Sequence, residues 1–424
     1  MSEQVPIYIK GVSLIDFRGF RNEHGFRFVD EKNKLCKWTV FLGNNNTGKT
    51  NLLKAIASLE PISDRSGKNL NFYPIGCKIN IFPKEKTVGS KLGLHIQPDL
   101  SEKDLEFENC LISYTNTTTF STYLIGNQYV ELKNLSIFGY GVVREIEKKG
   151  INTEEIELLN SDNLFNNTKL INFEDWLFQL DYAANNLHSP KENRMKAGER
   201  RDILKLVLSS EVFPEINDIR FISDKDLNNY IEFQTEDGWR RMSELGYGYQ
   251  ATLSWMADFC KKMFDKYSGS TNPLNEPAVL LIDEIDLHLH PQWQRGLIKS
   301  LSDIFPLTQF IVTTHSPFII QSMENVNLYT LNRVGDHTEV THLGNKSYIG
   351  WKIEEILSEV MGLEDNINTD VYQALIKQFD KALDKDDYKK GKEAYDKLMQ
   401  ILHPQSAERK LLDIQFTQLS PTND

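Results

Sequence analysis

Alternating hydrophobic and polar positions at the start of the chain predict antiparallel strands over residues 7–17 and 24–29. A short, largely apolar run over residues 38–43 follows and predicts a buried strand. Residues 50–59 then space their apolar side chains three and four positions apart, as one face of a helix requires. The first 60 residues are therefore predicted to form strands, a loop and a helix.

Two further apolar runs, residues 278–283 and 309–315, predict buried strands with a helical period between them. A strand, a helix and a second strand in this order form the repeating unit of a parallel sheet. Residues 172–212 also have helical spacing, and residues 215–245 return to short strands. From residue 353 onward the pattern is helical and strongly charged, which predicts a separate helical region.

A glycine-rich loop with a phosphate-binding pattern connects the strand at 38–43 to the helix that follows. Residues 43–50 match G-x-x-x-x-G-K-[ST], whose glycines let backbone N–H groups point at phosphate oxygens. In this pattern Lys49 reaches the β- and γ-phosphates, and the hydroxyl of Thr50 binds Mg²⁺. The predicted cofactors are therefore ATP and Mg²⁺. The predicted binding residues of the loop are Gly43, Asn44, Asn45, Asn46, Thr47, Gly48, Lys49, Thr50 and Asn51.

Two carboxylates, Asp283 and Glu284, come directly after the apolar run that begins at residue 278. A buried parallel strand carries such residues to its carboxyl end, beside the phosphate loop. We expect Asp283 to hold Mg²⁺ and Glu284 to polarise the attacking water. His315 ends the neighbouring predicted strand, so we expect it to sense the γ-phosphate. The sequence thus predicts ATP hydrolysis, with Glu284 and His315 as the catalytic residues.

Composition and charge limit the partners that the chain can have. The formal net charge of −12 disfavours a protein that coats DNA non-specifically, because phosphate neutralisation needs many Lys and Arg residues. The densest basic segment, residues 191–205, is explained more simply as a solvated helix start than as a nucleic-acid site. Four cysteines without a CxxC pair fit a reducing cytoplasm, and no apolar run approaches the roughly 20 residues that span a bilayer. We therefore expect a cytoplasmic protein without a membrane partner.

His288 and His290 form a His-x-His pair that would suit a metal ion. Zinc requires three or four protein ligands, and no cysteine or further histidine lies at a suitable spacing. We therefore expect no zinc site at this pair.

Taken together, these motifs resemble the ABC-type ATPase heads of the RecF, SMC and OLD group. Residues 8–60 and 240–320 carry the resemblance: IDLHLHPQW resembles the D-loop region of that group, and TTHSPF its switch-histidine motif. The resemblance implies an α/β fold, an ABC-ATPase head of the P-loop NTPase class. This head has a mixed sheet with an antiparallel β-subdomain, a helical insertion and a C-terminal helical region. It also implies a nucleotide held between two heads, and hence a homodimer or higher homo-oligomer.

In this group the second head contributes a signature loop, which corresponds here to residues 243–250. Glycine stands where the pattern has serine, so Gly246 and Gly248 are expected to offer backbone N–H groups to the γ-phosphate. Ser243 is the candidate for the missing hydroxyl, and Gln97 is the candidate for the Q-loop glutamine. The departure from the pattern predicts slow hydrolysis.

A second set of motifs, less specific than the phosphate loop, resembles the PtuA-type ATPases of Septu antiphage systems, including those associated with retrons. They are FGYG followed by Arg144, the segment 164–177, the signature segment and the ending at 402–412. The resemblance implies a regulatory ATPase in antiphage defence that controls a partner HNH nuclease (PtuB-like) through nucleotide-dependent engagement of heads. Nucleic acid or a retron ribonucleoprotein is a further candidate partner.

The sequence lacks the heptads of a long coiled coil, the acidic pattern of a TOPRIM nuclease and an HNH pattern. We therefore expect no nuclease site in the chain itself. Two alternatives stay open: a RecF-like DNA-repair ATPase that clamps DNA directly, and an autonomous nuclease with an unrecognised site.

The chain is expected to contain four segments. Residues 1–130 form the first part of the head with the phosphate loop, and residues 131–212 form a mostly helical insertion. Residues 213–350 form the second part of the head, with the signature loop, the Asp283–Glu284 strand and His315. Residues 351–424 form a helical region that we expect to bind a partner.

Overall fold

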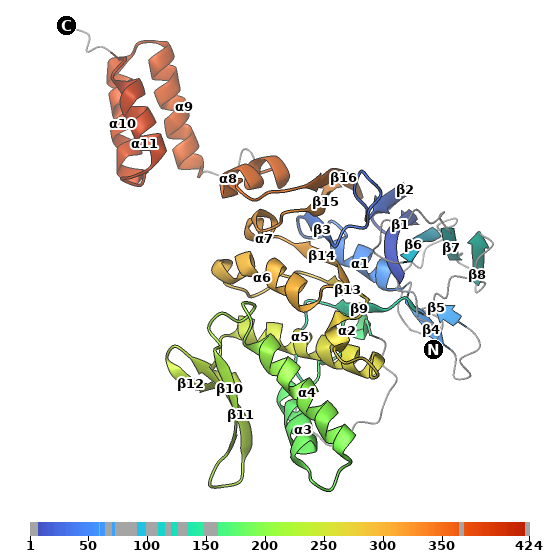
Figure 1. The fold of residues 1–424 in the computed structure, drawn as a ribbon. Helices are drawn as coiled ribbons and strands as arrows, with labels where there is room; N and C mark the ends of the chain where they lie inside the picture. The colour runs from blue at the N-terminus through green and yellow to red at the C-terminus, as the bar shows by residue number, and fades with distance from the viewer. Residues whose placement is uncertain are drawn as a thin grey trace. The chain divides into compact units, whose positions relative to one another are not determined.

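The chain divides into two compact units, Met1–Ile353 and Glu354–Asp424, in a computed structural model (Figure 1). The second unit begins at Glu354, within the segment 351–424 that is expected to be helical. The described residues are 7–58, 60–63, 70–72, 91–98, 109–114, 120–125, 134–147, 160–363 and 369–419, with strands between 61 and 125 described by their backbone alone.

A six-stranded sheet with the order β16-β15-β3-β14-β13-β9 forms the centre of the first unit. Its strands are β3 (Trp38–Gly43), β9 (Ile137–Tyr140), β13 (Ala278–Ile282), β14 (Thr308–Thr314), β15 (Val326–Val334) and β16 (His337–Lys346). Neighbouring strands are parallel except β15 and β16, which are antiparallel. Helix α6 (Pro291–Ile304) connects β13 to β14, as the predicted strand–helix–strand unit requires.

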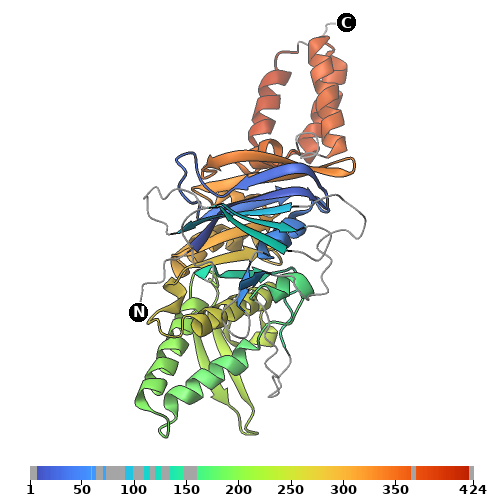
Figure 2. The ribbon, with the colours of Figure 1, turned by 90° about the vertical axis from the view of Figure 1, so that its right-hand side faces the viewer.

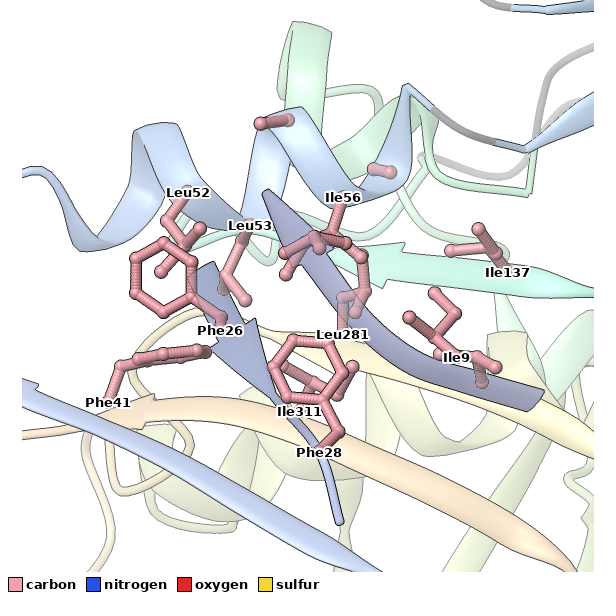
Figure 3. Packing of buried hydrophobic residues seen from close by; sticks show 14 of the residues in the cluster. Ile9, Phe26, Phe28, Phe41, Leu52, Leu53, Ile56, Ile137, Leu281 and Ile311 are labelled. Carbon is pink, nitrogen blue, oxygen red and sulfur yellow. The ribbon is translucent and has the colours of Figure 1, made fainter. Parts of the chain in front are cut away.

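A second sheet is antiparallel throughout and has the order β2-β1-β6-β7-β8 (Figure 2). Its strands are β1 (Ile7–Phe17), β2 (Phe20–Arg27), β6 (Lys91–Pro98), β7 (Asn109–Tyr114) and β8 (Phe120–Ile125). Helix α1 (Lys49–Ala57) packs with both sheets, and the shared core joins Ile9, Phe26, Leu53, Ile56 and Leu281 (Figure 3). The predicted α/β head with a mixed sheet and an antiparallel β-subdomain is confirmed.

Helix α5 (Tyr247–Lys266) packs against the six-stranded sheet through aromatic side chains. The ring of Phe259 lies 5.1 Å from that of Phe138 in β9 and 4.9 Å from that of Phe305. Burying such large apolar side chains stabilises the contact between helix and sheet. The start of α5, which carries the signature segment, is thereby fixed relative to β9 and β13.

The segment between β9 and α5 contributes helices and a small sheet to the first unit. Its elements are α2 (Asp162–Asn166), α3 (Phe173–Asn185), α4 (Lys191–Leu208), β10 (Asp218–Ser223), β11 (Asn229–Thr235) and β12 (Gly238–Arg241). Arginines of the basic segment at 191–205 fix α4 to its neighbours. Arg200 donates a 2.8 Å hydrogen bond to the carbonyl oxygen of Phe264, and Arg201 pairs with Asp181 at 2.8 Å. These contacts favour the structural interpretation of the basic segment.

The second unit is a set of amphipathic helices, α9 (Asp370–Asp384), α10 (Tyr388–Ile401) and α11 (Ala407–Phe416). They share a small core of Leu375, Phe379, Ala394, Leu398 and Leu412. Within the described part of the chain, neither these helices nor any other is both long and apolar enough to cross a membrane. The remaining short elements are β4 (Pro61–Ser63), β5 (Leu70–Phe72), α7 (Pro317–Gln321), α8 (Ile353–Glu355), 3-10 turns at Met242–Glu244 and Pro273–Asn275, and a π-helical turn at Ile356–Val360.

Candidate functional site

The phosphate loop runs from the end of β3 to the start of α1 and depends on glycine at both ends. At Gly43 a Cβ atom would lie 2.3 Å from the carbonyl oxygen of Leu331 in β15, so only glycine fits there. Gly48 is the N-cap of α1 and has φ of 94°, a left-handed conformation that glycine adopts without strain. The predicted loop therefore opens onto the positive end of a helix.

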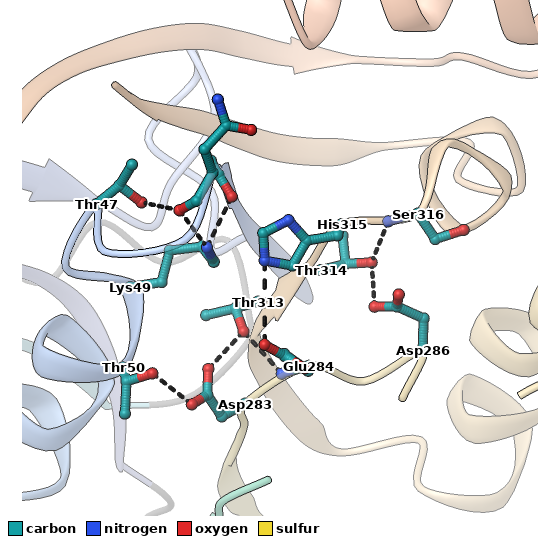
Figure 4. Close-up of polar contacts among 12 residues, drawn as sticks. Thr47, Lys49, Thr50, Asp283, Glu284, Asp286, Thr313, Thr314, His315 and Ser316 are labelled. Atoms are coloured by element: carbon teal, nitrogen blue, oxygen red, sulfur yellow. Dashed lines mark hydrogen bonds and ion pairs between the residues drawn. The ribbon is translucent and has the colours of Figure 1, made fainter. Parts of the chain in front are cut away.

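Lys49 lies inside the loop and is only 6% exposed. Its Nζ donates hydrogen bonds of 2.7 Å to the carbonyl oxygen of Gly43 and 3.0 Å to that of Asn44 (Figure 4). Burial lowers the pKa of Lys49, and the charges of Asp283 and Glu284 partly offset this effect. The ammonium group is thus held within the loop, where it can meet phosphate oxygens.

Asp283 accepts hydrogen bonds from two hydroxyl groups that come from different elements. Thr50 Oγ1 in α1 donates to Oδ2 at 2.6 Å, and Thr313 Oγ1 in β14 donates to Oδ1 at 2.7 Å. The carboxylate is 2% exposed. Carboxylate and hydroxyl oxygens are hard ligands of the kind that Mg²⁺ prefers. The structure therefore brings together the two residues that the sequence nominated for the metal.

Glu284 follows Asp283 in a left-handed backbone conformation with φ of 50°. This conformation costs roughly 1–2 kcal/mol for a residue with a Cβ atom. Its N–H donates a 2.8 Å hydrogen bond to Thr313 Oγ1. The side chain is 32% exposed, and its carboxylate lies on the side of His315 (Figure 4). A partly hydrated carboxylate in this position can accept a proton from water.

His315 directly follows β14 and lies next to Glu284. The distance from His315 Nε2 to Glu284 Oε1 is 4.0 Å, longer than a hydrogen bond. This buried nitrogen has no hydrogen-bond partner among the described residues. Burial and the charge of Lys49 lower the pKa of His315, so the imidazole is neutral at pH 7. Its Nε2 can therefore make one hydrogen bond to a bound phosphate or water.

The two signature glycines differ in their surroundings. Gly246 is the exposed N-cap of α5, and a Cβ atom there would meet nothing within 4 Å. Gly248 is buried, and a Cβ atom there would lie 2.1 Å from the carbonyl oxygen of His288 in the same chain. The ring of Tyr247 also packs edge-on against that of His288, with centroids 4.8 Å apart. The signature segment is thus fixed against the D-loop of its own head, and Gly246 faces outward.

The two histidines of the His-x-His pair serve local contacts. His290 is the N-cap of α6 and accepts a 3.4 Å hydrogen bond from the N–H of Gln292. His288 has a left-handed backbone conformation, with φ of 64°, and packs against Tyr247. In the part of the chain that the structure describes, no group of three or more His, Cys, Asp or Glu residues could hold a metal ion.

Sequence reasoning missed residues that support the site from neighbouring strands. Thr313 lies within the TTHSPF motif, and the parallel pairing of Ile282 with Val312 places it beside Asp283. Thr338 in β16 braces the phosphate loop by donating a 2.9 Å hydrogen bond to the carbonyl oxygen of Thr47. The parallel strand pattern could have revealed Thr313, whereas nothing in the sequence pointed to Thr338.

Gln97, the candidate Q-loop glutamine, lies in β6. Its backbone pairs with Tyr8 in the antiparallel sheet, and its side chain lies outside the described residues. The hydroxyl of Tyr8 donates to the carbonyl oxygen of Leu307, next to the amino end of β14. The role of Gln97 therefore stays a prediction.

A parallel sheet that ends in a phosphate loop, a hydroxyl–carboxylate pair and an adjacent acid defines a P-loop ATPase. The sequence profile of the AAA ATPase domain family matches residues 68–320, more than half of the chain. The chain belongs to this family, and it is an ATPase.

Comparison with other proteins identifies relatives over most of the chain. The Septu protein PtuA of Bacillus thuringiensis is 28% identical over 415 residues, which cover 95% of this chain and 96% of that protein. The retron Vc95 probable ATPase of Vibrio cholerae serotype O1 biovar El Tor is 25% identical over 391 residues, covering 77% of this chain and 74% of that protein. A crystal structure of an SMC head bound to the C-terminal winged-helix domain of ScpA gives a TM-score of 0.48 at 16% identity, covering 80% of this chain and 98% of that one.

The Septu and retron relatives confirm the resemblance to PtuA-type ATPases, and the family match confirms an ATPase. The names of the relatives describe those proteins, and they do not by themselves assign a partner to this chain.

Proposed function

We propose that the chain is the ATP-hydrolysing regulatory subunit of an antiphage defence complex and controls a partner nuclease by engagement of two heads. One observation carries the hydrolytic part: Thr50 and Thr313 both donate to Asp283, and Thr313 also accepts from the N–H of Glu284. A single set of hydrogen bonds thus joins the metal-binding oxygens to the candidate base.

In this proposal Thr50 and Asp283 hold Mg²⁺, which supplies charge neutralisation at the β- and γ-phosphates. Lys49 contacts the same phosphates from inside the loop. Glu284 accepts the proton of the attacking water, and the neutral imidazole of His315 donates a hydrogen bond to the γ-phosphate. Glu284 and His315 lie 4.0 Å apart and do not hydrogen-bond to each other. This separation leaves Glu284 free to contact the attacking water and His315 free to contact a γ-phosphate oxygen.

Engagement of two heads is proposed because one residue of the signature segment, Gly246, is open to solvent. Gly246 is exposed, whereas Gly248 is buried against His288. The N–H at Gly246 and the start of α5 can therefore meet the γ-phosphate of a second chain. Since ATP binds the engaged state better than the separated state, it shifts the balance toward a homodimer or a higher oligomer.

The partner is proposed from the relatives and from the second unit. One relative is named Septu protein PtuA, and the Vibrio cholerae relative is named retron Vc95 probable ATPase. The helices of the second unit expose Val371, Leu411 and Ile414, each more than half accessible. Exposed apolar side chains of this kind suit a protein partner. We infer that this unit binds an HNH nuclease of the PtuB kind.

The ATPase assignment is tested with Glu284→Gln. This variant should bind ATP as the natural protein does, lose turnover by orders of magnitude and accumulate as engaged dimers. Size-exclusion chromatography with light scattering, with and without Mg·ATP, measures the engagement. Lys49→Ala is the matched control, because it should lose both nucleotide binding and dimerisation. Normal turnover by Glu284→Gln would show that another residue is the base.

The partner assignment is tested by co-expression with the product of the adjacent gene. The two proteins should co-purify, and deletion of residues 370–419 should release the partner while ATPase activity remains. DNA binding by the chain alone with a steep salt dependence would instead favour the RecF-like clamp. Metal-dependent DNA cleavage by the purified chain that survives Glu284→Gln would favour an autonomous nuclease.

A further inference from the structure

Arg144 lies just beyond β9 and is 4% exposed. One nitrogen of its guanidinium, NH2, donates to two consecutive backbone carbonyl oxygens, at 3.0 Å to Asp283 and 2.8 Å to Glu284. Its Nε donates to the carbonyl oxygen of Gly141 at 3.3 Å. The guanidinium therefore fastens the segment after β9 to the end of β13.

These contacts reach an acidic residue whose backbone is in a left-handed conformation. Glu284 has φ of 50°, and its N–H is already held by Thr313 at 2.8 Å. Arg144 holds the carbonyl oxygen of the same residue. A strained residue keeps its conformation only where the surroundings fix it, and here both of its backbone polar groups are fixed.

The positive charge of Arg144 is buried near the negative charges of Asp283, Asp286 and Glu284. Burial lowers the pKa of Arg144 to about 10, and the charges of Asp283, Asp286 and Glu284 oppose that effect. The guanidinium therefore stays protonated at pH 7. Its NH1 is buried and has no hydrogen-bond partner among the described residues. A buried cation with a donor left over is expensive to keep, and the three negative charges offset only part of that cost, which indicates a role beyond packing.

We propose that Arg144 is a positioning residue for hydrolysis, which holds the backbone of Glu284 so that its carboxylate faces the attacking water. The proposal rests on the role of Glu284 proposed above. Arg144 acts through this backbone, and its loss should slow the chemical step more than it weakens nucleotide binding.

The test compares three variants in single-turnover and steady-state ATPase assays. Arg144→Met removes the donors, and Arg144→Lys keeps a charge but replaces the planar fork by a single ammonium. Arg200→Met is the matched control, because Arg200 also donates to a backbone carbonyl oxygen, that of Phe264, but far along α5 from the site. Thermal unfolding and the affinity for a fluorescent ATP analogue are measured for all three.

Arg144→Met should lower kcat roughly 10–100-fold with KM nearly unchanged, as loss of a residue that orients another usually does. Arg144→Lys should recover part of kcat, and Arg200→Met should keep it. Equal losses of kcat for Arg144→Met and Arg200→Met, or a rise in KM that accounts for the whole effect, would overturn the proposal.

If Arg144→Met does not fold, Arg144→Lys decides the question: wild-type kcat would overturn the proposal, and a reduced kcat at unchanged KM would support it. The two proposals can fail separately. Normal turnover by Glu284→Gln removes the role of Glu284, whereas an inactive Glu284→Gln beside a fully active Arg144→Met removes only the role of Arg144.

Discussion

The hydroxyl of Thr50 donates a 2.6 Å hydrogen bond to Oδ2 of Asp283, although 233 positions separate the two residues. The bond joins the first turn of α1 to the end of β13, and it places a hydroxyl oxygen beside a buried carboxylate. An alcohol and a carboxylate in contact can bind the same magnesium ion, directly or through its water ligands.

Thr50→Val should therefore weaken the response to magnesium. The valine keeps the shape of threonine but removes the hydroxyl, so half-maximal ATPase activity should require roughly 10–100-fold more Mg²⁺. Thr50→Ser keeps the hydroxyl and should behave like the natural protein. Magnesium titrations of ATP hydrolysis measure both variants, and identical curves for the valine and serine variants would exclude a metal-binding role.

Lys49→Met should abolish the stabilisation of the fold by nucleotide. A ligand present at 100 times its Kd adds about 2.7 kcal/mol to the free energy of unfolding, which appears as a rise in Tm. Without the Lys49 ammonium the β- and γ-phosphates lose their partner, so Tm should no longer depend on ATP. Lys54→Met, further along α1, should retain the shift. Equal shifts in both variants would place the nucleotide elsewhere.

Gly246→Asp should fold normally but fail to engage a second head. The backbone at Gly246 (φ −56°, ψ 146°) suits aspartate, and aspartate is a favourable N-cap residue. Its carboxylate would, however, repel a γ-phosphate brought to the start of α5.

Measurements of thermal unfolding and of ATP-dependent dimerisation separate the two effects of this substitution. Gly269→Asp is the control, because Gly269 is also exposed with nothing within 4 Å but lies beyond the other end of α5. If Gly246→Asp dimerised with ATP as well as Gly269→Asp does, the signature contact would lie at another residue.

Glu60 should make stability depend on pH. It is 5% exposed at the end of the segment that follows α1, and it accepts hydrogen bonds from Asn160 and Ser161 at 2.8 and 3.0 Å. Burial raises the pKa of Glu60 from 4.5 to about 7. The folded chain thus binds this proton more tightly than the unfolded chain, so the free energy of unfolding falls as the pH rises from 4.5 to 7.

Glu60→Gln should remove this fall in the free energy of unfolding, which amounts to roughly 3 kcal/mol for one carboxyl group. The variant should be more stable than the natural protein at pH 8, and the difference should shrink toward pH 5. Denaturant unfolding at the two pH values measures it. Glu324→Gln changes an exposed carboxylate and should show no such pH dependence. A Glu60→Gln effect that is the same at both pH values would contradict the prediction.

Hydrophobic periodicity predicted the main parallel strands of the first unit and the helix between two of them. It could do so because the spacing of apolar residues differs between a strand and a helix. The buried runs became β3, β13 and β14, and the segment between the last two became α6. Periodicity did not reveal which strands are neighbours. For example, the pattern did not show that β6 pairs with β1 in the antiparallel sheet.

The sequence by itself determined the chemistry of the phosphate loop and the order of Asp283 and Glu284. The hydrogen bond inside the loop is local, because Lys49 bonds to Gly43 only six positions away. Only the tertiary structure decided which residues hold the backbone of Glu284. Thr313, 29 positions away, accepts a hydrogen bond from its N–H, and Arg144, 140 positions away, donates one to its carbonyl oxygen. Such contacts depend on the order of strands in the sheet, and a pattern that repeats every two or 3.6 residues does not encode that order.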